Sequence, residues 1–507
     1  MYIKNKLIKE SFINQYLLFF IIIILPQIFF YEDLWDGTIY NYAQQIDEFD
    51  GAKLQLYEPG WVLNYWFIFL IIKIANFFKV EYYTLYILLL SILYLLFLFE
   101  VNKFIKKFLF NDKKLVSRTL FLISLFSIQS YYYSSIMLWH LFCQFSIFFG
   151  IRKFYSSSSI NLIITFLFLF IGFSFKSALL YIFAISLYYN KNKIFTKKYL
   201  FLLLYGFTIF IFFHYYLNNF GRAEKYAQIL NPFNFENFLI IIKSFLTYTT
   251  FLLPLGLLLF YFVIKIFFKR QKINKKIIFQ FILKNKYLII ILISGIIPYV
   301  AIGRSHVIWD VEDWAGRNAI LLILPISFLS IITIEFFYKL NVITKKISFY
   351  CFTFLLVFNI FFLTKGVTAK LNRIIYQNEL SSIIKENKNL LNEPSGIVIF
   401  IDENKIRPIF RINEINYLTY KSIGKNNLWS IYLNSYEKNL IKYPRNNKYK
   451  NLYGSSFSSK EELEKQCLII LTLSSNELKT NLNKFLNILY KDYFQISLIK
   501  IEKKNCS

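Results

Sequence analysis

Long apolar segments alternate with short polar ones along the first 365 residues of this 507-residue chain. Many of the apolar segments approach the roughly 20 residues that a helix needs to cross a bilayer. None has the strict apolar–polar alternation of strands in a membrane barrel. The pattern predicts an all-α polytopic membrane protein, with apolar segments near residues 15–31, 61–79, 83–101, 119–137, 138–151, 159–175, 178–190, 199–217, 239–263, 287–303, 318–338 and 346–365.

The chain from about residue 366 to residue 507 is polar and follows a different pattern. Helical periodicity occurs in NELSSIIKENKNLL and NELKTNLNKFLNILY, and short strand patterns occur in GIVIFID, CLIILTL and ISLIKI. Strand, helix and strand in succession predict a small α/β domain. We therefore expect a transmembrane domain over 1–365 and a soluble α/β domain over 366–507.

Basic residues set the expected orientation in the membrane. The formal net charge is +28, and lysines and arginines cluster between apolar segments, at 102–118, 191–198 and 264–286. The positive-inside rule places such loops in the cytoplasm, and this distribution argues against nucleic acid as a partner. The first apolar segment is long for a signal peptide, so we expect it to be retained with a cytoplasmic N-terminus. The expected location is the cytoplasmic (inner) membrane, with the C-terminal domain extracytoplasmic.

Two adjacent apolar segments conflict with this orientation. Full crossings by both 61–79 and 83–101 would place the basic loop 102–118 outside. A re-entrant or interfacial helix at 61–79, interrupted by Lys73, removes the conflict, because protein can cover non-helical backbone at membrane depth. This arrangement gives about eleven crossings, and the alternative is about twelve crossings with the charge rule violated.

The four cysteines, Cys143, Cys351, Cys467 and Cys506, are far apart in the sequence. They form no CxxC pair, and their spacing predicts neither a zinc site nor a disulfide framework.

Acidic residues concentrate in YEDLWDGTIYNYAQQIDEFDGAKLQLYEPGW (31–61), which carries seven acids and one lysine and is expected outside the cytoplasm. If residues 37–48 are helical, Asp36, Tyr40 and Gln44 share one face. Asp36 could then be a helix N-cap or a base that takes a proton from a hydroxyl nucleophile, and spacing alone does not separate the two. We take Asp36 as the first candidate catalytic residue and Glu58 as the second, with Tyr40 beside them.

A second polar loop, GRSHVIWDVEDWAGR (303–317), is expected on the same face. Arg304 and Arg317 are candidates for binding phosphate, although snorkelling to lipid headgroups explains such arginines as well. His306 is a further candidate. With Asp310 and Asp313 it could hold a divalent cation, but an acidic loop needs no metal to be soluble, and we assign no metal ligand.

Two ionisable residues stand within apolar segments, Lys176 in GFSFKSALL and His140 in MLWHLF. Ionisable residues at membrane depth are functional candidates, but both residues also fit positions at helix ends. We keep Lys176 as a candidate phosphate-binding residue and favour a structural position for His140.

The segment LWDGTIYNYAQQI…YEPGWVLNYWFIFLIIKI resembles the start of the EpsG family, polytopic proteins of exopolysaccharide assembly related in role to Wzy O-antigen polymerases. Asp36, Tyr40 and Glu58 occupy places comparable to that family's acidic segment and its E-x-G helix, with the order Asp-Gly-Thr here instead of Gly-Thr-Asp. Residues 131–187 resemble the family's middle, and WAGRNAILLILPISF resembles its late arginine, at Arg317.

The first loop also resembles GT-C glycosyltransferases, in which an acidic residue of the first extracytoplasmic loop precedes a proline-led helix, here at Pro59. Those enzymes use polyprenyl-phosphate sugars, and many carry a soluble extracytoplasmic C-terminal domain. These resemblances imply a lipid-linked sugar or oligosaccharide as the substrate and other glycan-assembly proteins as partners.

We therefore expect a membrane glycosyltransferase or polysaccharide polymerase that uses polyprenyl-(di)phosphate-linked sugars in exopolysaccharide, capsule or O-antigen assembly. A GT-C single-sugar transferase and a flippase or transporter of lipid-linked glycans are the alternatives.

Overall fold

The structure is a computed structural model of the chain. It describes residues 13–34, 37–46, 49, 62–108, 112–156, 162–190, 196–213, 230–268, 275–303, 319–391, 396–402, 412–424, 428–432, 467–476, 495–504 and 506.

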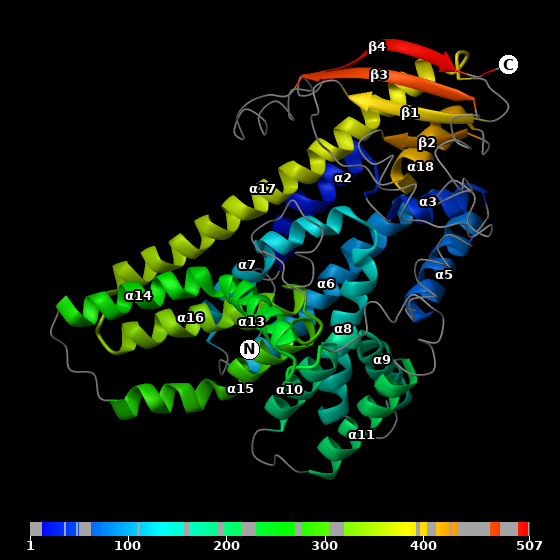
Figure 1. The fold of residues 1–507 in the computed structure, drawn as a ribbon. Coiled ribbons are helices and arrows are strands. Elements are labelled where there is room, and N and C mark those ends of the chain that lie inside the picture. Colours follow the sequence, from blue (N-terminus) through cyan, green and yellow to red (C-terminus); the bar gives the residue numbers. More distant parts are fainter. Residues whose placement is uncertain are drawn as a thin grey trace.

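The described part of the chain is mostly helical, and a small sheet lies at its C-terminal end (Figure 1). Among the described residues, five helical segments are long and apolar enough to cross a membrane, namely Ile13–Phe30, Tyr82–Lys107, Lys276–Ala301, Ala319–Lys339 and Lys345–Glu386. A sixth exists if α13 (Phe235–Thr249) and α14 (Leu253–Phe268), which meet at 70°, count as one broken span. The sequence prediction of about eleven crossings stays a prediction.

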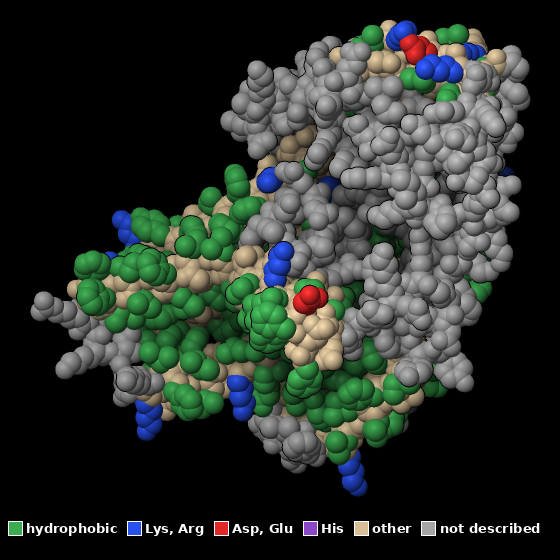
Figure 2. Space-filling model, viewed as in Figure 1, with side chains coloured by type: hydrophobic (Ala, Val, Ile, Leu, Met, Phe, Trp, Pro, Cys, Tyr) green, Lys and Arg blue, Asp and Glu red, His purple; other side chains and the backbone are tan. Residues whose placement is uncertain are grey.

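Apolar side chains cover the outside of these helices. Only 22% of the apolar window in Lys276–Ala301 is buried, and Phe267 and Phe268 at the end of α14 are almost fully exposed. Figure 2 shows hydrophobic side chains over this face, with lysines at its margins. Soluble proteins rarely expose contiguous apolar patches above a few hundred Å², so this surface suggests a multi-pass membrane protein.

The expected single helix over 119–137 is wrong. Helix α7 (Lys113–Ser124) ends early, and a 3-10 segment η3 (Ser127–Tyr133) follows it. Gln129 Nε2 donates to the carbonyl of Ile123 at 2.8 Å, and the Ser130 hydroxyl donates to the carbonyl of Ser127 at 2.9 Å. Such local side-chain bonds compete with the α-helical ladder, which explains the change of conformation.

The apolar segment expected over 239–263 forms two helices that meet at an angle. It breaks between α13 and α14 at η7 (Thr250–Leu252), where the hydroxyls of Thr249 and Thr250 bond to the carbonyls of Leu246 and Thr247. Pro254 follows directly, and it lacks the amide hydrogen that a continuous helix would need.

The remaining helical elements either are shorter than a membrane span or belong to the spans named above. They are η1 (Phe20–Ile24), α2 (Leu25–Phe30), α3 (Gly37–Ile46), α5 (Val62–Phe78), α6 (Tyr82–Phe108), α8 (Met137–Ser156), α9 (Leu162–Ser174), η5 (Lys176–Ala178), α10 (Leu179–Tyr189), α11 (Lys197–Ile211), α15 (Lys275–Ala301), α16 (Ile323–Lys339) and α17 (Lys345–Glu386).

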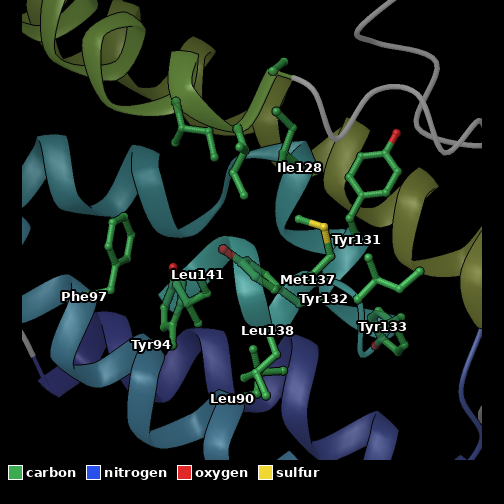
Figure 3. Close-up of a cluster of buried hydrophobic side chains, with 14 of the residues drawn as sticks. Leu90, Tyr94, Phe97, Ile128, Tyr131, Tyr132, Tyr133, Met137, Leu138 and Leu141 are labelled. Carbon is green, nitrogen blue, oxygen red and sulfur yellow. The ribbon is translucent and has the colours of Figure 1, made fainter. Parts of the chain in front are cut away.

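A tyrosine-rich core joins the first span, α6, η3 and α8. Tyr94 of α6 stacks on Phe19 and meets Tyr132 of η3 edge to face. Figure 3 shows Tyr94 and Tyr132 packed with Leu138 and Leu141 of α8. The Tyr133 hydroxyl donates to the carbonyl of Ile22 at 3.0 Å, so η3 is bonded to the first span as well as packed on it.

Helix α5 returns the chain to the place where it left α3. Gln44, near the end of α3, donates to Asn76 Oδ1 at 3.0 Å and to the carbonyl of Val80 at 2.8 Å. Its own oxygen accepts the amide of Tyr82, the first residue of α6, at 2.6 Å. The end of α3 and the start of α6 therefore lie at the same depth along the helices. This supports the interpretation of 61–79 as a re-entrant or interfacial helix.

Helix α17 extends from the spanning helices into the C-terminal domain. It has 42 residues, which corresponds to a length of roughly 63 Å at 1.5 Å per residue. The boundary expected near residue 366 falls inside this helix, so the two parts of the chain are connected by a rigid element. The segment NELSSIIKENKNLL, predicted to be helical, forms the last turns of α17 as far as Glu386.

The C-terminal domain is an α/β unit, as predicted. Its sheet has the order β2-β1-β3-β4, with β1 parallel to β2 and β3, and β3 antiparallel to β4. The strands are β1 (Gly396–Asp402), β2 (Leu428–Tyr432), β3 (Leu468–Asn476) and β4 (Gln495–Lys504). β1, β3 and β4 confirm three predicted strands, whereas β2 and helix α18 (Ile412–Ile423) were not predicted. The predicted helix NELKTNLNKFLNILY lies outside the described residues.

The cysteine spacing predicted no disulfide framework, but the structure contains a disulfide bond. Cys467 and Cys506 are bonded, with Cα atoms 4.4 Å apart, although 39 positions separate them in the sequence. The antiparallel pairing of β3 with β4 brings the two residues together. Cys143 and Cys351 are free and buried among the helices.

Labelling of the free cysteines tests this disulfide. In protein denatured without reductant, we expect two polyethylene-glycol maleimides per chain on a gel, from Cys143 and Cys351, and four after reduction. The Cys506→Ser variant should take up three without reduction, because Cys467 then has no partner. Four labels on unreduced wild-type protein would contradict the disulfide.

Candidate functional site

The chain leaves its first span through a sharp turn at Tyr31. This residue has φ 41° and ψ 56°, a left-handed conformation that is uncommon outside glycine. Its amide donates to the carbonyl of Gln27 at 3.0 Å, and its ring packs edge to face on Tyr83 of α6. The turn directs Glu32, Asp33 and Leu34 into the protein, where all three are buried.

Three nitrogen donors surround the carboxylate of Asp33. Its Oδ1 accepts the backbone amides of Leu34 at 2.8 Å and Ser135 at 3.0 Å, and its Oδ2 accepts Asn41 Nδ2 at 3.1 Å. Ser135 belongs to the connection from η3 to α8, and Asn41 belongs to α3. One side chain therefore bonds the first loop, the α3 helix and the start of α8.

Gly37 lets α3 begin against this carboxylate. A Cβ atom at position 37 would lie 2.3 Å from Asp33 Oδ1, closer than any non-bonded contact allows. The amide of Gly37 also donates to the carbonyl of Leu34 at 3.1 Å, and that carbonyl accepts the Ser134 hydroxyl at 2.8 Å. The residues on both sides of Trp35 and Asp36 are thus held in place.

Burial changes the proton affinity of this carboxyl group. It raises the pKa of Asp33 from 3.8 to about 7, while the bonds from Ser135 and Leu34 oppose the shift. Burial also raises the pKa of neighbouring Glu32, against the opposing effect of Lys421. The first loop therefore holds a carboxyl group that changes charge near neutral pH.

The C-terminal domain docks onto the same loop. Lys421 Nζ of α18 lies 2.7 Å from Glu32 Oε2, and the Tyr420 ring meets the ring of Tyr42 in α3 edge to face. Behind this contact, Glu414 of α18 is fully buried and forms a two-point ion pair with Arg373 of α17. Figure 1 shows α3 and α18 close together beneath the sheet.

The predicted helix at the first loop is confirmed as α3, and Tyr40 and Gln44 share a face as expected. Tyr40 is completely buried, and its ring meets Tyr82 of α6 edge to face at 5.9 Å. Gln44 binds the end of α5 and the start of α6. This face of α3 is directed toward the helices.

Five of the predicted site residues lie outside the described part of the chain, namely Asp36, Glu58, Arg304, His306 and Arg317. Lys176 begins η5, the joint between α9 and α10, and its backbone alone is described. His140 is buried in the first turn of α8, the structural position that the sequence analysis favoured.

A series of contacts connects the first loop with the start of the second. Ser135 binds Asp33 two residues before α8 begins, and His140 in the first turn of α8 meets the ring of Phe175 edge to face. Phe175 adjoins η5, where the Ser177 hydroxyl accepts the Tyr299 hydroxyl near the end of α15 at 3.0 Å. The second loop begins at Gly303, four residues after Tyr299, so this series of contacts joins the start of the first loop to the end of α15.

The sequence analysis did not single out Asp33 among the seven acids of the first loop, and it missed Asn41, Ser135 and Lys421. Asn41 lies eight residues after Asp33, in the short helix that follows it. This spacing was a usable signal that the two side chains could meet. Ser135 binds through its backbone amide, for which no side-chain pattern exists.

Lys370 was also missed. It is buried in α17 over the ring of Tyr131, with 4.9 Å between Nζ and the ring centroid.

Among the described residues, no group of three His, Cys, Asp or Glu side chains could hold a metal ion. No protein-family model matches the chain, and no curated protein sequence or solved structure matches it either.

The Gly37→Ala variant tests the close approach of α3 to Asp33. We expect a loss of about 1–3 kcal/mol in stability, because the added methyl group overlaps a carboxylate that three donors hold. The thermal midpoint in detergent measures this loss. Gly256→Ala in α14 is the control, since nothing lies within 4 Å of a Cβ there, and alanine favours a helix interior by about 1 kcal/mol. Equal midpoints for Gly37→Ala and the wild type would contradict the described contact.

The pH dependence of stability tests the burial of Asp33. The folded protein binds this proton more tightly than the unfolded chain, so the stabilisation is complete below about pH 3.8 and is lost as pH rises through about 7. The midpoint of Asp33→Asn relative to wild type should therefore rise between pH 5 and pH 8. A difference that stays constant over this range, measured by differential scanning fluorimetry, would show that Asp33 does not titrate there.

Proposed function

We propose that the protein is a membrane glycosyltransferase that forms glycosidic bonds with sugars linked to polyprenyl phosphate or diphosphate. The observation that carries the proposal is the series of contacts from Asp33 through Ser135, Phe175 and Tyr299. It supports a site in which an acidic loop and a loop with two arginines begin at one end of the helices.

The two loops match the two needs of such a transfer. A sugar on a lipid phosphate already has a good leaving group, so catalysis requires positive charge on the departing phosphate more than a general acid. Arg304, Arg317 and Lys176 would supply that charge, with His306 nearby in the sequence. The acceptor hydroxyl requires a base, and Asp36, in front of α3, would be that base.

Asp33 and Tyr40 have supporting positions in this scheme. Asp33 is 1% exposed and accepts three hydrogen bonds, including one from Asn41 of α3, so it holds the start of α3 against the first loop. Tyr40 packs α3 onto α6. Glu58 remains the second candidate for the base.

Two independent features support an extracytoplasmic location for the site and the docked domain. Disulfides persist mainly in oxidising compartments, and Cys467–Cys506 lies in the C-terminal domain. The positive-inside rule places the basic loop 102–118 on the opposite side. A docked soluble domain also favours a single-sugar transferase of GT-C type over a polymerase.

The Asp36→Asn variant tests the proposal. If Asp36 is the base, transfer from a polyprenyl-linked donor by the purified protein should fall by about 10²–10⁴-fold. Asp112→Asn is the control, because it makes the same exchange at the N-cap of α7, in the basic loop. Wild-type product formation by a normally folded Asp36→Asn protein would refute the assigned base.

Lipid-linked intermediates in a deletion strain separate the remaining functions. Loss of a single-sugar transferase leaves a carrier glycan that is one sugar short, whereas loss of a polymerase leaves one complete repeat unit on the carrier. Translocation of lipid-linked oligosaccharide by purified protein in liposomes, without a new glycosidic bond, would identify a flippase instead.

A further inference from the structure

We propose that a cationic pocket between α7, α16 and α17 binds the phosphate of an anionic phospholipid headgroup. The pocket has a volume of about 490 Å³, and Lys114, Arg118, Lys345 and Lys346 line it. Lys114 belongs to the basic loop 102–118, whereas the candidate glycosyltransferase site lies near the far end of α17. The proposal does not depend on the proposed enzymatic function.

Two helices begin beside this pocket, but their side-chain caps limit what the helix ends add to its charge. Helix α7 begins at Lys113 and helix α17 begins at Lys345, and a helix N-terminus carries a partial positive charge that favours anions. Asp112 and Thr344 cap the two helices with their side chains. These caps occupy the amides of Lys114, Leu115 and Ile347, and the Asp112 carboxylate offsets the partial charge of α7. The four lining cations therefore supply the positive charge of the pocket.

One carboxylate, Glu335, also lines the pocket and must be counted against an anion. It lies 3.5 Å from Lys339, one turn further along α16. Four lining cations against one ion-paired carboxylate leave an excess of positive charge. A phosphodiester would offset this charge, and basic pockets between spanning helices on the cytoplasmic side are typical sites for anionic headgroups.

The surroundings of the pocket favour a lipid over a free ion. Phe349 lines the pocket and is 55% exposed, and Tyr350 beside it is 54% exposed. Exposed apolar residues continue along α17 at Phe354, Val357 and Phe361. The Arg118 guanidinium lies 4.9 Å from the centroid of the Phe352 ring. A headgroup in the pocket would thus have an apolar helix surface beside it for its acyl chains.

A repeated sequence supplies a close control. Thr344-Lys345-Lys346 begins α17, and Thr196-Lys197-Lys198 begins α11 with the same type of threonine cap. Lys197 and Lys198 are exposed at their helix start but do not line the pocket. Removing either lysine pair changes the net charge equally.

Titration of phosphatidylglycerol into the delipidated full-length protein, read by native mass spectrometry, tests the proposal. Lys345→Gln/Lys346→Gln should bind phosphatidylglycerol about 25-fold more weakly than the wild type, since each cation contributes roughly a factor of five. Lys197→Gln/Lys198→Gln should bind like the wild type, and so should Lys345→Arg/Lys346→Arg, which keeps both charges and shows that the altered helix start still folds.

Four results would overturn the proposal. The first is equal affinity of the Lys345→Gln/Lys346→Gln variant and the wild type. The second is equal weakening by both lysine-to-glutamine pairs, which would indicate general surface charge. The third is equal binding of phosphatidylcholine, which would identify a non-selective lipid contact. The fourth is complete displacement of the lipid by millimolar inorganic phosphate, which would identify a free-anion site.

Discussion

The buried carboxylate of Asp33 is the interaction on which this end of the molecule depends. A carboxylate out of water is costly unless donors replace its hydration, and here two backbone amides and the Asn41 amide do so. Those donors come from the first loop, from the start of α8 and from α3. The position of α3 in turn fixes Gln44, which binds the end of α5 and the start of α6.

The C-terminal domain depends on the same loop through a second buried carboxylate. Glu32 is 2% exposed, and its partner Lys421 comes from α18. Removing one member of a buried ion pair leaves an uncompensated charge, which costs more than the intact pair contributes. The pairing of Glu414 with Arg373 applies the same constraint between α18 and α17. The domain is therefore held in one position on the helices, beside the loop that carries Asp36.

The sequence predicted features that depend on local pattern. Apolar runs marked the helices, the i, i+4 spacing of Tyr40 and Gln44 marked one face of α3, and short apolar runs marked β1, β3 and β4. The sequence did not predict features that depend on contacts between residues far apart in the chain. The amide of Ser135 has no side-chain signature, and Cys467 meets Cys506 only because β3 pairs with β4. The break after Ser124 is a different case, because its cause is local: Gln129 and Ser130 bond to nearby carbonyls, which the apolar pattern of the segment does not show.

The distribution of charge along α17 connects the two ends of the protein. Its first turn carries Lys345 and Lys346 at the cationic pocket, and Arg373 near its other end pairs with Glu414 in the docked domain. An α-helix bends little without proline, glycine pairs or inserted side chains, and α17 is continuous over 42 residues. A headgroup that fixes its first turn would therefore also limit the tilt of its far end. With a headgroup bound there, Lys345 and Lys346 would act on the position of α18 over the first loop as well as on the orientation that the positive-inside rule predicts.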